Sequence, residues 1–231
     1  MSDIAVVDYG MGNLRSVSKA IEHVAPGRTV TVTSDPRAVR AAARVVFPGQ
    51  GAMPDCMREL DARRLREAVL EAARSKPFLG ICIGLQMLFE SSEEGDVPGL
   101  GLLPGRVVRF PHADLADAAG QRLKVPHMGW NEVQQTLPHP LWAGIPDRSR
   151  FYFVHSYYPA PAQREIIAGY TLYPFPFACA VASQNLFAAQ FHPEKSQDCG
   201  LRLLGNFVNW DGVWDAAIPG TRASALPRMG P

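Results

Sequence analysis

Residues 77–86 read Pro-Phe-Leu-Gly-Ile-Cys-Ile-Gly-Leu-Gln, an apolar run that passes through a Gly-x-Cys-x-Gly turn into a second apolar segment. The run over 77–81 predicts a buried strand, and residues 85–89 predict the start of a helix. A Gly-x-nucleophile-x-Gly sequence at such a junction holds the central side chain in a strained turn that points out of the sheet. The stretch therefore predicts an α/β fold with Cys82 at the end of a strand.

The chain before this turn alternates between strand and helix patterns. Strands are predicted at 4–8, 30–33 and 44–47, and helices at 14–24, after Asp35-Pro36 and at 60–74. Such alternation predicts a mostly parallel sheet with helices on both faces. The carboxyl ends of parallel strands meet at one edge, where active sites form.

The pattern changes after Gly105. Short apolar runs separated by Pro- and Gly-rich turns predict strands at 106–110, 151–156, 166–172, 178–182 and 187–191. We interpret them as an antiparallel extension of the same sheet. A last helix is predicted at 196–210, and neither a repeat nor a linker divides the chain, so a single domain is expected.

Composition narrows the possible functions of this 231-residue chain. It is 47% hydrophobic and 19% charged, which is typical of a globular protein, and its net charge of +1 gives no reason to expect nucleic acid or an anionic membrane as partner. The four cysteines form no C-x-x-C pair, so neither a metal site nor a disulfide framework is expected. The uncharged segment 166–193 contains prolines and amides, which favours paired strands over a membrane span. We expect a cytoplasmic protein with reduced thiols.

Cys82 has the setting of a nucleophile. A helix N-terminus follows it, which favours the thiolate, and the backbone N–H of Ile83 is placed to bind an oxyanion. The alternative is an inert cysteine buried in a strand-to-helix turn.

Phe191-His192-Pro193-Glu194 supplies what a nucleophilic cysteine needs, a base and an acceptor that orients the base. A turn would bring the Glu194 carboxylate back to the His192 imidazole. The alternative is a surface turn with a capping glutamate. Cys82 and His192 meet only if their two strands are neighbours.

A third candidate is the turn Pro48-Gly49-Gln50-Gly51 at another strand end. Its backbone N–H groups are suited to an anion, but it lacks the Gly-Lys-Ser/Thr of a P-loop. The alternative is an ordinary tight turn. His127 and His155 are weaker candidates that border a pocket at most.

Together these motifs resemble the triad, or class I, glutamine amidotransferases: residues 80–86 resemble the nucleophile motif, 191–194 the His-Pro-Glu motif and 48–51 the oxyanion strand. Longer stretches at 8–13, 126–131, 152–157 and 192–196 resemble one branch of that family. The resemblance covers about residues 3–210. It predicts an amidotransferase domain over 1–210 and a tail over 211–231 that is extended or disordered.

The resemblance implies hydrolysis of the glutamine side-chain amide through a thioester, without cofactor or metal. Cys82 is then the nucleophile, His192 the acid and base, and Glu194 the group that orients His192. The oxyanion hole would use backbone N–H groups of Ile83 and of the 49–51 strand, and the residues implied for glutamine binding are Gly51, Gln86, Ser156 and Tyr157.

The same branch implies a partner. Its members form a heterodimer with a (β/α)8-barrel cyclase of histidine biosynthesis, which uses the ammonia to make imidazole glycerol phosphate and an aminoimidazole carboxamide ribotide. The residues expected at the interface or gate are Asn13, Arg15, Trp130 and Lys195. The alternatives are a glutaminase that serves another synthase, a silent scaffold of the same fold, or a different α/β cysteine hydrolase or redox protein.

Overall fold

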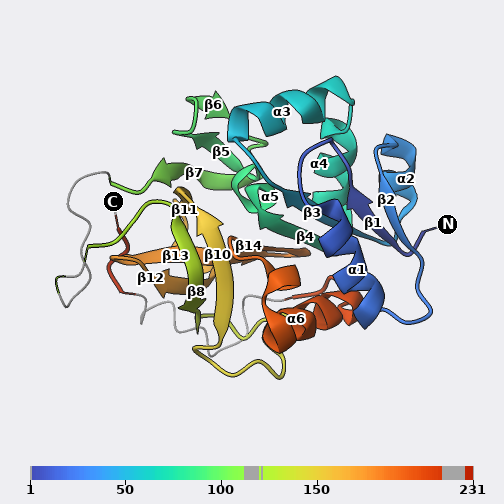
Figure 1. Cartoon of the computed structure of the whole chain (residues 1–231). Coiled ribbons are helices and arrows are strands. Elements are labelled where there is room, and N and C mark those ends of the chain that lie inside the picture. The colour runs from blue at the N-terminus through green and yellow to red at the C-terminus, as the bar shows by residue number, and fades with distance from the viewer. Residues whose placement is uncertain (1, 112–119, 121, 215–226, 231) are drawn as a thin grey trace.

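A central eight-stranded sheet organises the chain in the computed structural model, which describes residues 2–111, 120, 122–214 and 227–230. The strand order is β2-β1-β3-β4-β14-β13-β12-β9. The first five strands pair in parallel and the last three antiparallel. The α/β expectation, with a parallel sheet and an antiparallel extension, is confirmed (Figure 1).

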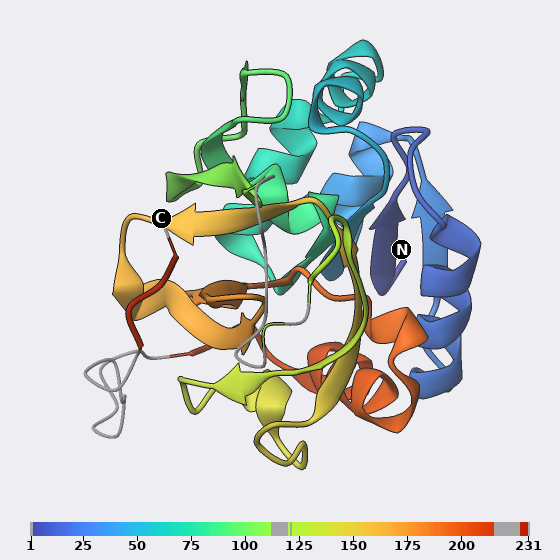
Figure 2. The same cartoon turned by 60° about the vertical axis from the view of Figure 1, so that its left-hand side comes forward.

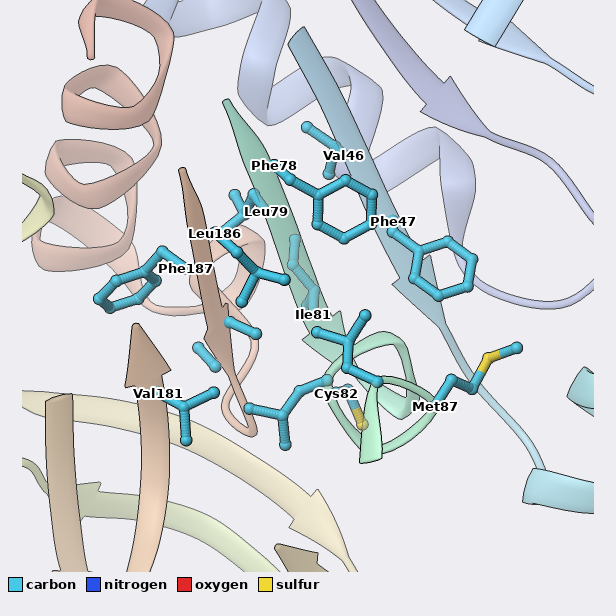
Figure 3. Packing of buried hydrophobic residues seen from close by; sticks show 14 of the residues in the cluster. Val46, Phe47, Phe78, Leu79, Ile81, Cys82, Met87, Val181, Leu186 and Phe187 are labelled. Atoms are coloured by element: carbon cyan, nitrogen blue, oxygen red, sulfur yellow. The ribbon is translucent and has the colours of Figure 1, made fainter. Parts of the chain in front are cut away.

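Four of the five parallel strands are short apolar segments buried on both faces, as strands between two helical layers must be, whereas the edge strand β2 is partly exposed. The five strands are β1 (Ile4–Val7), β2 (Val30–Thr33), β3 (Arg44–Gly49), β4 (Phe78–Cys82) and β14 (Leu186–Ala189). Figure 3 shows their packing around β4, with Phe78 and Leu186, which pair in register, toward the start of the strand and Cys82 where it ends.

Helices cover both faces of the parallel strands. The pair α1 (Leu14–Val24) and α6 (Gln197–Asn209) lies on one face, and α2 (Pro36–Ala41) and α4 (Arg66–Ser75) pack together on the other. The turned view of Figure 2 shows α1 and α6 side by side. As expected, Asp35 caps α2, since its side chain accepts a hydrogen bond from Arg37 N at 2.8 Å.

The second half of the chain departs in part from the sequence expectation. Strands β12 (Ile167–Leu172), β13 (Pro176–Ser183) and β9 (Gln134–Gln135) extend the central sheet. The predicted strands at 106–110 and 151–156 do not join it. Their counterparts β7 (Leu103–Arg109) and β10 (Arg150–His155) belong to separate sheets, with the orders β11-β7-β5-β6 and β10-β8. The remaining strands are β5 (Phe89–Ser92), β6 (Val97–Pro98), β8 (His127–Glu132) and β11 (Tyr157–Pro161).

Two predicted helices are wrong in extent. The helix expected at 60–74 is two helices, α3 (Met53–Ala62) and α4, because Arg64 has a φ of +57° between them. The helix expected at 85–89 is the single turn α5 (Ile83–Gln86), after which the chain becomes β5. Short 3-10 turns stand at Pro140–Trp142, Arg164–Ile166 and Pro193–Lys195.

Most of the predicted tail, residues 215–226 and 231, lies outside the described residues. Of the rest, Gly230 N donates to Pro176 O at 2.9 Å and Arg164 Nη2 to Pro227 O at 3.0 Å, so residues 227–230 run against the antiparallel part of the molecule. In the part of the chain that the structure describes, no helix is long and apolar enough to cross a membrane.

Candidate active site

Cys82 ends β4 in a backbone conformation that side chains rarely adopt, with φ +55° and ψ −113°. Strain of this kind persists only where the surroundings impose it, and it concentrates at functional sites. Here the close packing of strand and helix imposes it. A Cβ on Gly84 would lie 1.8 Å from Phe47 O, and one on Gly80 would lie 2.9 Å from the Ala188 Cβ. Both glycines of the motif are therefore required by contact, and the turn between them presents the Cys82 sulfur.

The glycine-rich turn after β3 lies beside this sulfur. Gly49 pairs with Cys82 in the β3–β4 register, and Gly51 has a φ of +109° that favours glycine. The buried ring of Tyr9 supports the turn from behind, since a Cβ on Gly49 would meet the Tyr9 hydroxyl at 2.3 Å. The backbone that the sequence suggests for an oxyanion hole is thus next to the candidate nucleophile.

His192 and Glu194 are joined directly. The chain turns as a 3-10 helix over Pro193–Lys195, and this brings Glu194 Oε1 to 2.8 Å from His192 Nδ1. Their side chains are only 5% and 1% exposed. His192 Nε2 is also buried and has no hydrogen bond of ordinary geometry to a described residue, so this nitrogen is available to the thiol.

The electrostatics tie His192 to Cys82. Burial acts to lower the pKa of His192, but its interactions with the nearby Cys82 sulfur and with the Glu194 carboxylate outweigh burial and raise that pKa to about 10. The surroundings of His192 therefore favour the charged form of its imidazole. Cys82 and His192 can meet only if the strands that precede them are neighbours. These strands are β4 and β14, which pair in parallel with Ala189 opposite Ile81.

A cavity of about 390 Å³ opens over these groups. The four residues that the family resemblance assigns to glutamine binding all line it, together with Cys82 and His192: Gly51, Gln86, Ser156 and Tyr157. Gln86 is almost wholly buried. Its Nε2 donates to Tyr157 O and to Gln190 Oε1, both at 3.0 Å, while its Oε1 has no hydrogen-bond partner among the described residues.

The two histidines that seemed weaker candidates form a buried pair behind the cavity wall. His155 Nδ1 bonds to Tyr157 O at 2.8 Å, and His155 Nε2 lies 2.9 Å from His127 Nδ1. Burial lowers the pKa of His155 to about 3 and that of His127 to about 4, so both rings are neutral at pH 7. They fix the Tyr157 carbonyl, and only His155 lines the cavity.

Sequence reasoning missed two residues of the site. Gln190 reaches the Cys82 sulfur, with Nε2 3.7 Å from Sγ, and its position just before Phe-His-Pro-Glu was the available signal. Glu94 lines the cavity and accepts a hydrogen bond from Met53 N at 2.8 Å. No pattern in the sequence distinguishes Glu94 from other acids of loops.

The four residues expected at an interface fall into two places. Trp130 and Lys195 both contact Tyr152, the former ring to ring at 6.1 Å and the latter with Nζ 5.9 Å from the ring centroid. Asn13 and Arg15 are exposed at the start of α1, where Asn13 Oδ1 accepts a bond from Ser16 N. The turn before them packs on the candidate oxyanion strand, since a Cβ on Gly12 would lie 3.8 Å from Gln50 N.

This fold and site define a class. A family model described as Glutamine amidotransferase class-I matches residues 5–209, and the chain belongs to that family. The fold agrees with a solved glutamine amidotransferase that is 16% identical, with a TM-score of 0.65, over 90% of this chain and all of that one. A second, from Thermotoga maritima, is 17% identical with a TM-score of 0.56, over 84% of this chain and 76% of that one.

Within the class, several similar sequences carry the description imidazole glycerol phosphate synthase subunit HisH. The protein of that description from Thiobacillus denitrificans is 67% identical over 228 residues, 99% of this chain and 97% of its own length. That from Aromatoleum aromaticum is 70% identical over 210 residues, 91% of this chain and 99% of its own length. The family predicted from the motifs, and the branch within it, are confirmed.

Proposed function

We propose that the chain is the glutaminase subunit of imidazole glycerol phosphate synthase, and that it hydrolyses glutamine at Cys82 and passes the ammonia to a cyclase subunit with which it forms a heterodimer. The observation that carries the proposal is the strained Cys82 beside the buried His192–Glu194 pair, at the floor of a cavity, in a chain so similar to HisH subunits.

The chemistry follows from these groups. The Cys82 thiolate attacks the amide carbon, and protonated His192 gives its proton to the departing ammonia. Glu194 holds the imidazole and stabilises its cation. Water then attacks the thioester, His192 takes a proton from it, and glutamate leaves. Backbone N–H groups of Ile83 and of Gly49, Gln50 or Gly51 stabilise the oxyanion, each worth about 2.7–4 kcal/mol when placed correctly.

The cavity suits the ends of glutamine. No described residue donates to the buried Oε1 of Gln86, and an N–H group of the substrate would supply that donor. Glu94 offers a carboxylate to the α-ammonium group. Backbone and hydroxyl groups at Gly51, Ser156 and Tyr157 complete the polar lining. These assignments give a role to the amide of Gln86 and the carboxylate of Glu94, which line the same cavity as the Cys82 thiol.

Ammonia released into water would be protonated and lost as a nucleophile, so a partner must cover the cavity. Trp130 and Lys195 around Tyr152, and Asn13 and Arg15 on α1, offer the contact and gate residues. The cyclase then converts a phosphorylated ribulosyl nucleotide into imidazole glycerol phosphate and an aminoimidazole carboxamide ribotide. We place this step of histidine biosynthesis in the cytoplasm.

The proposal is tested by synthesis in the complex with the cyclase, with either glutamine or an ammonium salt as nitrogen source. Cys82→Ala should abolish glutamine-driven synthesis and keep ammonium-driven synthesis. Survival of glutamine use in this variant would refute the role of Cys82. Measuring glutamine-dependent synthesis after mixing the chain with the cyclase or with other synthases identifies the partner. Failure of Cys82 to react with a glutamine-like electrophile would indicate a silent scaffold.

A further inference from the structure

The side chain of Gln190 is fully buried against the candidate nucleophile. Gln190 stands between β14 and His192, and its backbone N–H donates to Cys179 O at 2.8 Å. Its Nε2 lies 3.7 Å from Cys82 Sγ, and its Oε1 accepts a hydrogen bond from Gln86 Nε2 at 3.0 Å. The side chain is therefore held at both ends of its amide.

The neighbours of Gln190 fix which end of its amide faces the sulfur. The Tyr157 carbonyl can only accept, so the Gln86 atom that bonds to it is the amide nitrogen. That same nitrogen faces Gln190, so the Gln190 atom opposite is the oxygen. The nitrogen of Gln190 is left pointing at Cys82. This assignment follows from the bonding network and not from distinguishing oxygen and nitrogen by shape.

We propose that Gln190 is a further catalytic residue, whose Nε2–H group donates a hydrogen bond to the Cys82 sulfur and stabilises it as a thiolate. This inference rests on the function proposed above and adds a residue to it. A neutral thiol is a weak acceptor, whereas a thiolate accepts a charge-assisted bond, so the donor favours the anion. The sulfur thus meets two donors from one segment of chain, Gln190 and His192.

The same hydrogen bond acts twice in the reaction. Before attack it stabilises the thiolate that forms the bond to the amide carbon. When water adds to the thioester, the carbon–sulfur bond breaks, and its electron pair returns to the sulfur as the proton of water passes to His192. Gln190 then meets the departing thiolate, so we expect its loss to slow both half-reactions.

Two substitutions separate this role from packing. Gln190→Glu keeps the shape and the acceptor for Gln86 but faces the sulfur with an oxygen in place of a donor. Gln190→Met fills a similar volume but has neither the acceptor for Gln86 nor the donor to the Cys82 sulfur. Gln163→Glu, the same change at an exposed position, is the matched control. The readout is the rate of iodoacetamide alkylation of Cys82 between pH 5 and pH 10, followed on the Cys82 peptide because three other free thiols are present.

We expect alkylation of Cys82 at pH 7 to fall at least tenfold in folded Gln190→Glu, by less in Gln190→Met and not at all in Gln163→Glu. Glutamine turnover by the complex should show the same order in kcat, with KM changed less than threefold. If the alkylation profiles of both Gln190 variants superpose on that of the wild type, the inference is wrong. If they shift but the wild-type complex does not hydrolyse glutamine, the inference stands and the proposed function fails.

Discussion

Gly49 lies directly opposite Cys82 in the register of β3 and β4. The two strands are parallel, so both end at the same edge of the sheet, and the backbone that follows Gly49 passes the sulfur. The backbone at Gly49 can pack this closely against Tyr9 and Ile83 only because residue 49 has no side chain. Any Cβ there would collide with both residues.

Gly49→Ala should therefore destabilise the protein. The added Cβ would lie 2.3 Å from the Tyr9 hydroxyl, 2.8 Å from the Ile83 Cβ and 3.0 Å from Gly84 N. Overpacking of this kind costs about 1–3 kcal/mol, which urea denaturation measures. Adding Tyr9→Phe should recover only part of the loss, because two of the three contacts remain.

The matched control for that change is Gly205→Ala. Gly205 lies in α6, and the nearest atom to an added Cβ is the Val24 Cβ at 3.8 Å, an ordinary contact. Removing a glycine from a helix interior should stabilise the protein by up to about 1 kcal/mol. Equal free energies of unfolding for the two variants would show that the space around Gly49 is not as tight as described.

Cys82→Ala should lower the pKa of His192 from its value of about 10. The interactions of His192 with Cys82 raise that pKa, and without them burial acts against Glu194 alone. Imidazole ¹⁵N shifts across a pH titration measure the effect. His139, whose pKa burial lowers to about 3, serves as control and should not change. An unchanged titration of His192 would contradict the coupling.

The coupling also affects stability. Because the folded-state pKa of His192 is raised above its unfolded value, its contribution is fully present below about pH 6.5 and is lost as the pH rises through 10. The difference in free energy of unfolding between wild type and Cys82→Ala should therefore shrink toward pH 10. If that difference in free energy of unfolding does not change between pH 7 and pH 10, the coupling of His192 to Cys82 is contradicted.

Trp130→Ala should weaken the heterodimer with the cyclase by at least about tenfold, because an exposed tryptophan at an interface commonly carries a large share of the binding energy. Trp130 is 43% exposed and its neighbour Met128 65%, and exposed apolar side chains that gather on one face are typical of a protein–protein interaction site. Calorimetric titration with the cyclase measures the change.

Val32→Ala is the control for this surface. Val32 is 40% exposed on β2, at the opposite edge of the central sheet from the antiparallel strands. It should leave the affinity for the cyclase unchanged. Comparable weakening by both substitutions would remove Trp130 from the interface, and thermal unfolding of each isolated variant excludes a loss of fold as the cause.

The sequence was a good guide wherever local pattern and tertiary role agree. Val30–Thr33 is a strand with the predicted bounds, since its apolar alternation and flanking turns suffice to define it. The Gly-x-Cys-x-Gly turn was equally informative, because a side chain at either glycine would collide with an adjacent strand. His192 and Glu194 needed only a turn of chain to meet.

Features that depend on distant pairing escaped prediction. The strand β8 is defined by its antiparallel partner β10, which lies beyond an intervening loop, and β5 by its pairing with β7. The role of Gln190 depends on Gln86, a contact across 104 positions that no local pattern contains. The break at Arg64 is a positive φ without glycine, for which the residue itself gives no sign.

The pairing of β4 with β14 has a consequence for the growing chain. Cys82 leaves the ribosome long before the strand that places His192 and Glu194 beside it. Until that late strand docks, neither the His192–Glu194 pair nor Gln190 lies beside the Cys82 sulfur. The candidate site is therefore assembled only after almost all of the described strands and helices have been made.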